Sequence, residues 1–297
     1  MPTIAEHINS SGLAINGRPS LTEYKAASEE MTLDFPPHPD DIACDFLVST
    51  LIWYDIIACA STRGKPYLEH SYGYITTSEL SNIMGCESWA MILIYRISEL
   101  QRWKLTQDPC LIDMNFLVSQ GSELERLLKE GLERNQGELG GPMSRLGAAG
   151  GRNEPKPPLR TILLITRIFA LSAITYLHTV ISGPDPTEPQ IKKSVNETIE
   201  SFKELTDLSL MRNLVWPFCV TACMATGLSY ASITHETEGG VESFFSELLR
   251  DEKIEGCSGN LAKAWEIVLE CWKLREEGRN VDWVDGMKSL GYQVLLV

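Results

Sequence analysis

Two ionisable side chains, Arg167 and His178, interrupt a long apolar segment in the middle of the chain. Their spacing of eleven residues is close to three helical turns, so a helix places both on nearly the same face. A guanidinium and an imidazole on one face can bind the carboxylate or phenolate of a ligand. The simpler interpretation is that each polar tip reaches a Glu, a backbone carbonyl or solvent.

Two further charged residues, Asp55 and Arg96, also lie inside apolar segments. A charge inside a protein needs a partner, so these two can neutralise each other or Arg167. With Arg167 and His178 they form our set of candidate catalytic residues. Mutual neutralisation is the interpretation that we favour over catalysis.

Tryptophans recur in the same apolar segments, and three of them are candidate lining residues of a binding cavity. Trp53, Trp89 and Trp216, together with Arg167 and His178, could bind a flat and hydrophobic metabolite. Packing of the rings in a helical core explains the tryptophans equally simply. The sequence contains no fingerprint of a dinucleotide or nucleotide site, and we expect no cofactor.

Two acidic groups have some of the chemistry of a magnesium site, because hard oxygen ligands on facing helices can hold Mg²⁺ and a diphosphate. They resemble the paired metal motifs of class I terpenoid cyclases. The first group is one residue out of register, however, and Glu200 takes the place of a hydroxyl residue in the second. We therefore interpret them as a helix cap and a solvated helix face, with no metal bound. The residues are Asp40, Asp41 and Asp45 in the first group, and Asn196, Glu200 and Glu204 in the second.

Charge and cysteine spacing argue against direct contact with nucleic acid. The formal net charge is -14, and the only adjacent basic pair is Lys192-Lys193. Such a surface repels phosphate groups. None of the eight cysteines forms a Cys-x-x-Cys pair, so zinc-binding spacings are absent and reduced thiols inside a core are expected.

The two longest apolar runs read as buried helices. They lie near residues 47–59 and 162–181, and Asp55, Arg167 and His178 interrupt them. Both fall short of an uninterrupted membrane span. The first ten residues are polar and lack the apolar segment of a secretory signal. We expect a soluble intracellular protein without membrane contact.

The hydrophobic periodicity predicts an all-α fold of about nine helices. We expect residues 1–39 to be a partly ordered extension and residues 40–297 to form one helical domain. Within that domain the Gly- and Pro-rich residues 136–158 are expected to form a long flexible loop. Asp282 is expected to cap a last short helix that ends at Gly291. The main helices are expected at residues 42–60, 87–104, 113–135, 159–181, 191–202, 213–230, 241–249 and 261–277.

The last third of the chain carries a family resemblance. The segment Leu214-Val215-Trp216-Pro217-Phe218, followed by Ala222-Cys223, is similar to a helix of the fungal-specific transcription-factor domain. The closing pattern of Trp265, Trp272, Asp282-Trp283, Met287 and Gly291 resembles the C-terminal signature of that domain. Upstream, Trp53-Tyr54-Asp55-Ile56 resembles its central helix. The likeness extends over residues 40–297, and the order and spacing of the motifs make it specific.

The resemblance implies an all-helical regulatory region of the kind that usually follows a Zn₂Cys₆ DNA-binding cluster, which these residues lack. We therefore expect a fungal transcription-regulator-like domain that binds a small hydrophobic effector or a protein partner, with no DNA-binding cluster of its own. A homodimer and a location in the nucleus or cytoplasm of a fungal cell are compatible with this. The alternative hypothesis is a secondary-metabolism enzyme, a cyclase or isomerase that uses an apolar pocket in the same scaffold. A third is a scaffolding protein, which an exposed apolar patch would favour.

Overall fold

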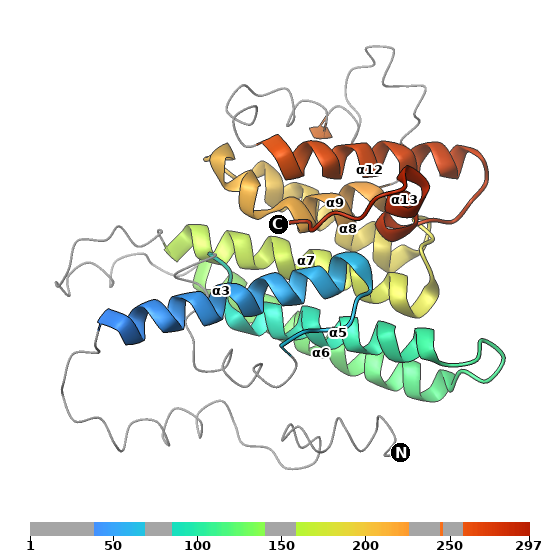
Figure 1. Ribbon diagram of the computed structural model, residues 1–297, viewed down its shortest axis with the longest axis horizontal. Coiled ribbons are helices and arrows are strands. Elements are labelled where there is room, and N and C mark those ends of the chain that lie inside the picture. Colours follow the sequence, from blue (N-terminus) through green and yellow to red (C-terminus); the bar gives the residue numbers. More distant parts are fainter. Residues whose placement is uncertain (1–38, 69–84, 140–158, 226–243, 246–257) are drawn as a thin grey trace. The chain divides into compact units, whose positions relative to one another are not determined.

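Helices are the only regular secondary structure in the described part of the chain. The computed structural model describes residues 39–68, 85–139, 159–225, 244–245 and 258–297. These residues form eight α-helices, one 3₁₀ helix and no strand, which confirms the predicted all-α class (Figure 1). The elements are α3 (Pro39–Thr62), α5 (Ser88–Thr106), α6 (Met114–Leu139), α7 (Leu159–Ser182), α8 (Pro189–Lys203), η3 (Leu208–Asn213), α9 (Val215–Cys223), α12 (Ser258–Glu276) and α13 (Trp283–Leu290).

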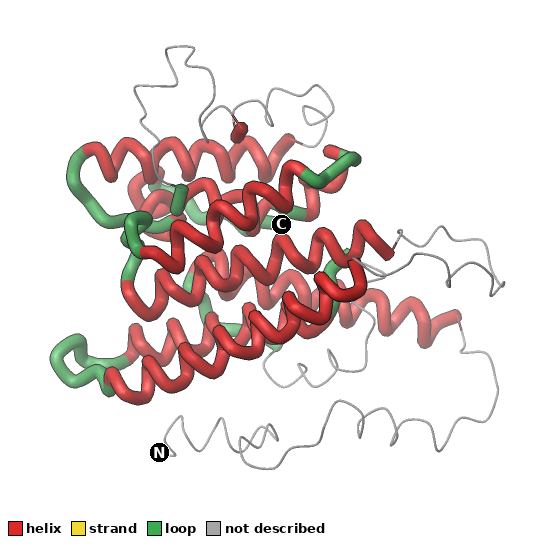
Figure 2. Tube along the Cα trace, turned by 180° about the vertical axis from the view of Figure 1, so that it is seen from behind, coloured by secondary structure: helices red, strands yellow, loops and turns green. Residues whose placement is uncertain are grey.

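Helix α7 is the central element of the core. It packs against α5, α6, α8 and α9, and the views from the front and from behind both place it between the α5–α6 hairpin and the α8–α9 layer (Figures 1 and 2). It is apolar on nearly every side because neighbouring helices surround it. Phe169 and Tyr176 are among its fully buried side chains.

The C-terminal helices are fixed by local capping. The side chain of Asp282 accepts hydrogen bonds from the N–H groups of Val284 and Asp285, and Asp285 completes a capping box. Gly291 ends α13 in the left-handed conformation, with φ of 76°. This is the backbone region that glycine enters at little steric cost. The predicted cap and stop of the last helix are confirmed.

Helix α6 extends beyond its predicted end at Asn135 and continues to Leu139, so the first residues of the predicted loop are helical. Asn135 is buried, and its amide donates to the carbonyl of Leu163 on α7 at 2.9 Å. This bond holds the last turns against the core, which outweighs the cost of about 1 kcal/mol for Gly137 in a helix. The remainder of the predicted loop lies outside the described residues.

Two other predicted helix ends differ from the structure. Helix α8 begins at Pro189 rather than at the predicted residue 191, and Glu188 caps it by accepting from Ile191 N–H. Helix α9 ends at Cys223, before the predicted end at residue 230. Residues 226–243 and most of the helix predicted at 241–249 lie outside the described part of the chain.

Two helices are long and apolar enough to match the composition of a membrane span. In α7 the matching stretch Leu159–Ser182 is 89% buried, which identifies it as a core helix. In α3 the stretch Ala43–Thr62 is only 44% buried. The two helices are therefore similarly apolar in composition, but neighbouring residues bury much more of α7 than of α3.

Candidate functional site

Arg167 and His178 do not meet, although one face of α7 carries both. Arg167 is half-buried, and its Nε donates to the Ser201 hydroxyl of α8 at 3.2 Å. His178 is buried, and its Nε2 lies 3.6 Å from a carboxylate oxygen of Glu125 on α6. Eleven residues of helix separate the two positions by roughly 16 Å along the axis. Each polar tip therefore contacts a different helix, and the described geometry does not place them around one ligand.

Asp55 and Arg96 also have partners within the protein. The buried Asp55 carboxylate accepts hydrogen bonds from the N–H groups of Tyr67 at 3.0 Å and Leu68 at 2.8 Å, which fixes the chain that follows α3. Burial lowers the pKa of Arg96, while the carboxylates of Glu123 and Glu99 oppose that shift. These contacts are the kind that buried charges need in order to be tolerated.

The candidate tryptophans are packed against the protein's own side chains. Trp53 is 3% exposed, and its ring meets Phe169 edge-on at 6.4 Å. Trp216 is 1% exposed and stacks on Phe169 at 6.1 Å. Trp89 is partly buried against the core, and its indole N–H donates to Glu87 at 2.8 Å. Trp53 and Trp216 belong to the core and Trp89 packs against it, which is the alternative that the sequence left open.

The acidic candidates show no metal-binding geometry in the described residues, where no group of three potential ligands occurs. Asp45 is exposed, and the side chain of Asp41 lies outside the described part. Asn196 and Glu200 are exposed on α8, and Glu204 is exposed directly after its end. Glu200 pairs with Lys203 at 2.7 Å, and Glu204 lies 4.0 Å from Arg160.

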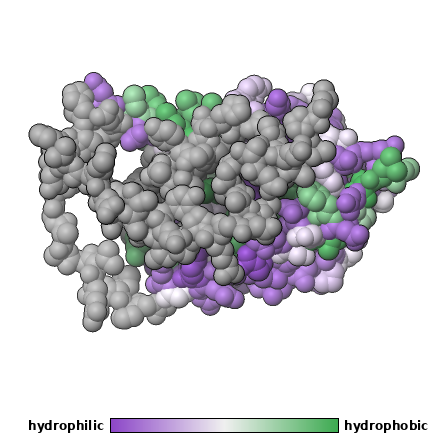
Figure 3. Space-filling model, turned by 90° about the horizontal axis from the view of Figure 1, so that it is seen from below, coloured by the Kyte–Doolittle hydropathy of each residue, from purple (hydrophilic) through white to green (hydrophobic). Residues whose placement is uncertain are grey.

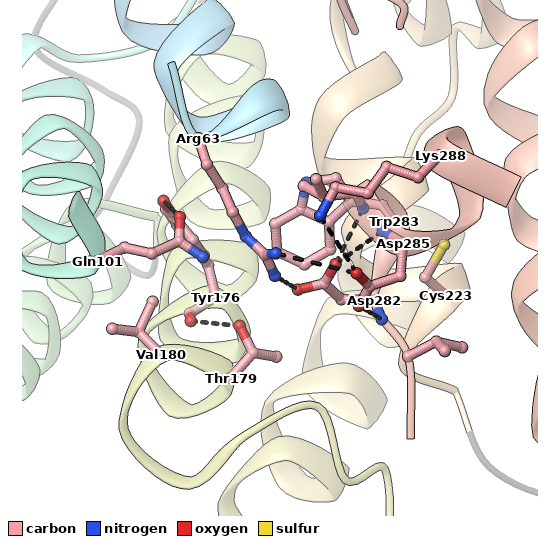
Figure 4. A network of polar contacts seen from close by, with 12 residues as sticks. Arg63, Gln101, Tyr176, Thr179, Val180, Cys223, Asp282, Trp283, Asp285 and Lys288 are labelled. Carbon is pink, nitrogen blue, oxygen red and sulfur yellow. Dashed lines mark hydrogen bonds and ion pairs between the residues drawn. The ribbon is translucent and has the colours of Figure 1, made fainter. Parts of the chain in front are cut away.

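A buried polar network lies where α3 ends against α13, and we call it the polar hub. Its central ion pair joins Arg63 to Asp282, whose side chain is 2% exposed (Figure 4). Arg63 also lies 4.0 Å from Asp285. The backbone of Arg63 has φ of 58°, which is uncommon for a residue other than glycine. This conformation costs about 1–3 kcal/mol, an amount that one favourable contact can offset. The hub consists of Arg63, Asp282, Asp285, Tyr176, Gln101 and Arg275.

The electrostatics of the hub depend on burial. Burial raises the pKa of Asp282, and the Arg63 guanidinium and the backbone N–H groups at the start of α13 oppose that rise. Burial also raises the pKa of Tyr176, whose hydroxyl donates to Gln101 at 2.7 Å. The phenol therefore stays neutral at physiological pH.

Arg275 and two buried thiols extend the hub towards α9. The Arg275 guanidinium donates to the carbonyls of Val281 at 2.7 Å and Cys223. The sulfurs of Cys223 and Cys271 lie 3.6 Å apart. Burial raises the pKa of Cys223, and contact with Cys223 together with burial raises the pKa of Cys271. Thiols that stay protonated are poor nucleophiles, so the pair acts as core packing.

The hub therefore connects elements and offers no reactive group. Arg63 joins the end of α3 to Asp282 and Asp285 at the start of α13. Arg275 of α12 separately bonds the carbonyls of Cys223 on α9 and Val281, and Tyr176 of α7 bonds Gln101 of α5. Sequence analysis identified Asp282 as a cap but missed Arg63. The two residues are 219 positions apart, and nothing in the local sequence of Arg63 indicates its partner.

Helix α3 presents a second feature, an uncharged apolar face. Leu47, Leu51 and Tyr54 are 58%, 56% and 38% exposed, and Ala58 is partly exposed. We call these four residues the α3 stripe. Their spacing of four, three and four residues aligns them along one side of the helix. The opposite side, with Ile52, Trp53, Ile56 and Ile57, is buried.

A second apolar patch covers the tip of the α5–α6 hairpin. Its side chains are 49–76% exposed, and Figure 3 shows hydrophobic surface gathered at the end of the view that this hairpin occupies. We call it the hairpin patch. The exposed Asp108 and Asp113 are its charged neighbours. Its residues are Leu105, Leu111, Met114 and Val118.

Comparison with known proteins assigns this helical chain to a family. Residues 20–297 match the fungal specific transcription factor domain, and the chain belongs to that family. This confirms the resemblance that the tryptophan and proline motifs of the last third carry. No solved structure matches the chain.

The curated relatives are regulators of biosynthetic pathways in fungi. The chain is 31% identical to the trichothecene biosynthesis transcription regulator TRI10 of Trichoderma arundinaceum, over 79% of this chain and 49% of that protein. It is 30% identical to TRI10 of Fusarium sporotrichioides, over 86% and 54% of the two chains. It is 25% identical to the ustiloxin B cluster transcription factor ustR of Aspergillus flavus, over 83% and 41%. The chain spans about half the length of these relatives.

Proposed function

We propose that the chain acts as the regulatory domain of a fungal transcription regulator that controls genes of a secondary-metabolite pathway. The observation that carries the proposal is the family match over residues 20–297, together with relatives that regulate trichothecene and ustiloxin B biosynthesis. The strongly acidic composition supports a role through molecules other than DNA, because the surface repels phosphates. Such a role places the protein in the nucleus, or in the cytoplasm before it enters the nucleus.

Of the two ligands that the sequence suggested, we propose a protein partner rather than a small hydrophobic effector. The residues expected to bind an effector are engaged with the protein itself, as the stacking of Trp216 on Phe169 and the contact of Arg167 with Ser201 illustrate. The exposed apolar side chains lie instead on helix surfaces, which is where proteins dock.

The enzyme hypothesis gains no support from the comparisons or from the described geometry. Every relative reported above is a transcription regulator. Of the polar groups that a cyclase or isomerase would use, Asp55 binds the backbone of Tyr67 and Leu68, and Arg167 binds Ser201 of α8. His178 Nε2 lies 3.6 Å from Glu125 of α6.

The function can be tested by disrupting the gene in its own fungus and measuring transcripts genome-wide. We expect the transcripts of a contiguous group of biosynthetic genes to change by at least about tenfold, which corresponds to about 1.4 kcal/mol in a binding equilibrium. Reintroduction of the gene should restore them. As a matched pair, Arg63→Ala should restore them poorly, while Lys288→Ala, at an exposed position next to the hub, should restore them fully. Unchanged biosynthetic transcripts after disruption would refute the proposal.

A further inference from the structure

The hairpin patch gathers four large apolar side chains at the tip of the α5–α6 hairpin. Leu105, Leu111, Met114 and Val118 are 57%, 76%, 54% and 49% exposed. Met114 and Val118 lie one turn apart on the same side of α6. Together the four residues present on the order of 400 Å², since a large apolar side chain covers roughly 150–250 Å² when fully exposed. Patches of this size typically mark a place where another molecule docks.

The tip of the hairpin is held in place by contacts of its own residues. The rings of Trp103 and Phe116 pack against each other with centroids 4.5 Å apart. In the turn, Asp108 Oδ1 accepts a hydrogen bond from the N–H of Cys110 at 2.9 Å. At the start of α6, Asp113 Oδ1 accepts from the N–H of Phe116 at 3.0 Å. The patch is therefore preformed, and a partner does not have to order it on binding.

The charges beside the patch are of one sign. Between residues 105 and 122 the only charged residues are Asp108 and Asp113, and both are exposed. The cations that precede them in α5 are already engaged, because Lys104 donates to a carbonyl at the end of α7 and Arg102 is paired within α5. Apolar side chains beside two exposed carboxylates favour a partner that combines apolar residues with Lys or Arg.

Charge and secondary structure together select the occupant. A second copy of this chain, with its net charge of -14, and an anionic lipid surface would both bring like charges to Asp108 and Asp113. The described residues contain no strand, so they offer no sheet edge to which a peptide strand could add. Met114 and Val118 form a ridge with the four-residue spacing that packs against a second helix. A helix with basic residues therefore fits best.

We propose that the hairpin patch docks an amphipathic helix of a protein partner, whose apolar side faces Leu111 and Met114 and whose Lys or Arg side chains reach Asp108 and Asp113. The inference rests on the proposed role through a protein partner, and it adds where that partner binds and what its contact helix is made of. Such a contact is smaller than the roughly 1,200 Å² of stable interfaces. We therefore expect a dissociation constant between roughly 10 and 100 µM.

The first test uses a fluorescent model peptide of about 16 residues, a helix with Leu along one side and Lys elsewhere. Its counterpart replaces every Lys by Glu and keeps the Leu side. Fluorescence anisotropy with the full chain is measured at about 0.15 M salt, where exposed charges more than about 8 Å apart are largely screened. The Lys peptide should bind in the expected range and the Glu peptide at least about tenfold more weakly. Absence of binding by the Lys peptide, or equal binding of the two, overturns the proposal.

The apolar side of the contact is tested by Leu111→Ser combined with Met114→Ser. Both side chains are more than half exposed, so the fold should tolerate the change, while binding of the Lys peptide should weaken at least about tenfold. The matched control is Leu47→Ser combined with Leu51→Ser in the α3 stripe, at 58% and 56% exposure. It should leave binding unchanged. Equal losses in the two variants, or no loss in the first, would place the peptide on another surface.

The charged side of the contact is tested by Asp108→Asn combined with Asp113→Asn. Asparagine keeps an oxygen for the turn and the helix cap, and binding of the Lys peptide should weaken about five- to tenfold. The control is Glu133→Gln combined with Glu138→Gln, which removes two charges from exposed positions at least about 30 Å further along α6. It should leave binding unchanged. Equal losses would show that net charge, and not the patch, attracts the peptide.

A fluorescent reporter locates the peptide without altering the patch. Cys44 and Cys110 are both exposed, and Cys110 lies in the turn of the hairpin. One protein keeps Cys110 for an environment-sensitive dye and has Ser at Cys44 and Cys257. The other keeps Cys44 and has Ser at Cys110 and Cys257. The Lys peptide should shift the emission of the dye at Cys110 only, and equal shifts in the two proteins would contradict the proposed site.

Two other occupants give results that can be told apart. Vesicles of phosphatidylcholine that bind the wild-type chain but not the variant with Ser at Leu111 and Met114 would assign the patch to a lipid surface. A dimer that this variant alone loses in sedimentation equilibrium would assign it to a second copy. Either result overturns the proposal. The role in transcription is tested separately by gene disruption, so the two can fail independently.

Discussion

Helices α7 and α3 resemble each other in length and apolar composition but differ in what surrounds them. Both are 24 residues long, and both contain a stretch apolar enough to match a membrane span. Neighbouring helices bury 89% of that stretch in α7 and 44% in α3. The apolar composition of a helix therefore predicts that it is stabilised by apolar contacts. Only the structure shows whether neighbouring helices of the same chain supply those contacts.

The inner side of α3 nevertheless belongs to the core. Trp53 meets Phe169 of α7, and the carbonyl of Ala60 accepts a hydrogen bond from the indole of Trp283 at 3.3 Å. The polar hub then fixes the end of the helix through Arg63 and Asp282. Helix α3 is thus anchored to the core on one side and apolar on the other.

The largest effect is expected from removing the ring that packs on α7. Trp216 is 1% exposed, stacks on Phe169 and meets Tyr176 edge-on at 6.0 Å. Trp216→Ala should lower the free energy of unfolding by about 3–5 kcal/mol through lost contacts and an unfilled cavity. Urea denaturation measures this, and an unchanged midpoint would show that the surroundings of α7 are not a tightly packed core.

The next effect concerns the anchor of α3. Arg63→Ala leaves the Asp282 carboxylate buried without its ion-pair partner. We expect a loss of about 2–3 kcal/mol in unfolding free energy, below the 3–5 kcal/mol of a fully buried pair because Arg63 still reaches water.

The matched control for that experiment is the double variant Arg63→Ala with Asp282→Asn. It removes the unpaired charge and keeps a side chain that can cap α13, so it should recover part of the loss. A double variant less stable than Arg63→Ala alone would show that Asp282 acts mainly through contacts other than the ion pair.

The sequence predicted the helices more completely than it predicted the contacts of the candidate site residues. Periodicity predicted α7 from Leu159 and the Asp282 cap of α13, because both are determined by residues close together in the chain. Arg63 was missed because its partner lies 219 residues away. Arg167 and His178 were placed on one face, which helical geometry allows. The sequence could not indicate that α8 and α6 approach that face at different heights.

The thiols around the core give a smaller and pH-dependent effect. Burial raises the pKa of Cys86 and Cys223, and the pKa of Cys271 is also raised. Above about pH 8.5 these groups ionise in the unfolded chain but stay protonated in the folded one. The unfolded state then binds fewer protons, so stability that is present at neutral pH is lost as the pH rises.

Above about pH 8.5, each thiol should lower the free energy of unfolding by about 1.4 kcal/mol per pH unit. Denaturation under reducing conditions at pH 8, 9 and 10 measures the slope. Cys271→Ala should reduce the slope by about one group's share. An equal slope in the variant would contradict burial of this thiol in the folded state.

The comparison between the two helices is tested most directly by one pair of leucines. Leu171 on α7 is 1% exposed and Leu51 on α3 is 56% exposed. We predict that Leu171→Ala lowers the free energy of unfolding by about 2–5 kcal/mol. Leu51→Ala should change it by less than about 0.5 kcal/mol, with urea denaturation as the measurement for both variants. Equal losses at the two positions would contradict the account, because they would mean that the outer side of α3 is as buried as the centre of α7.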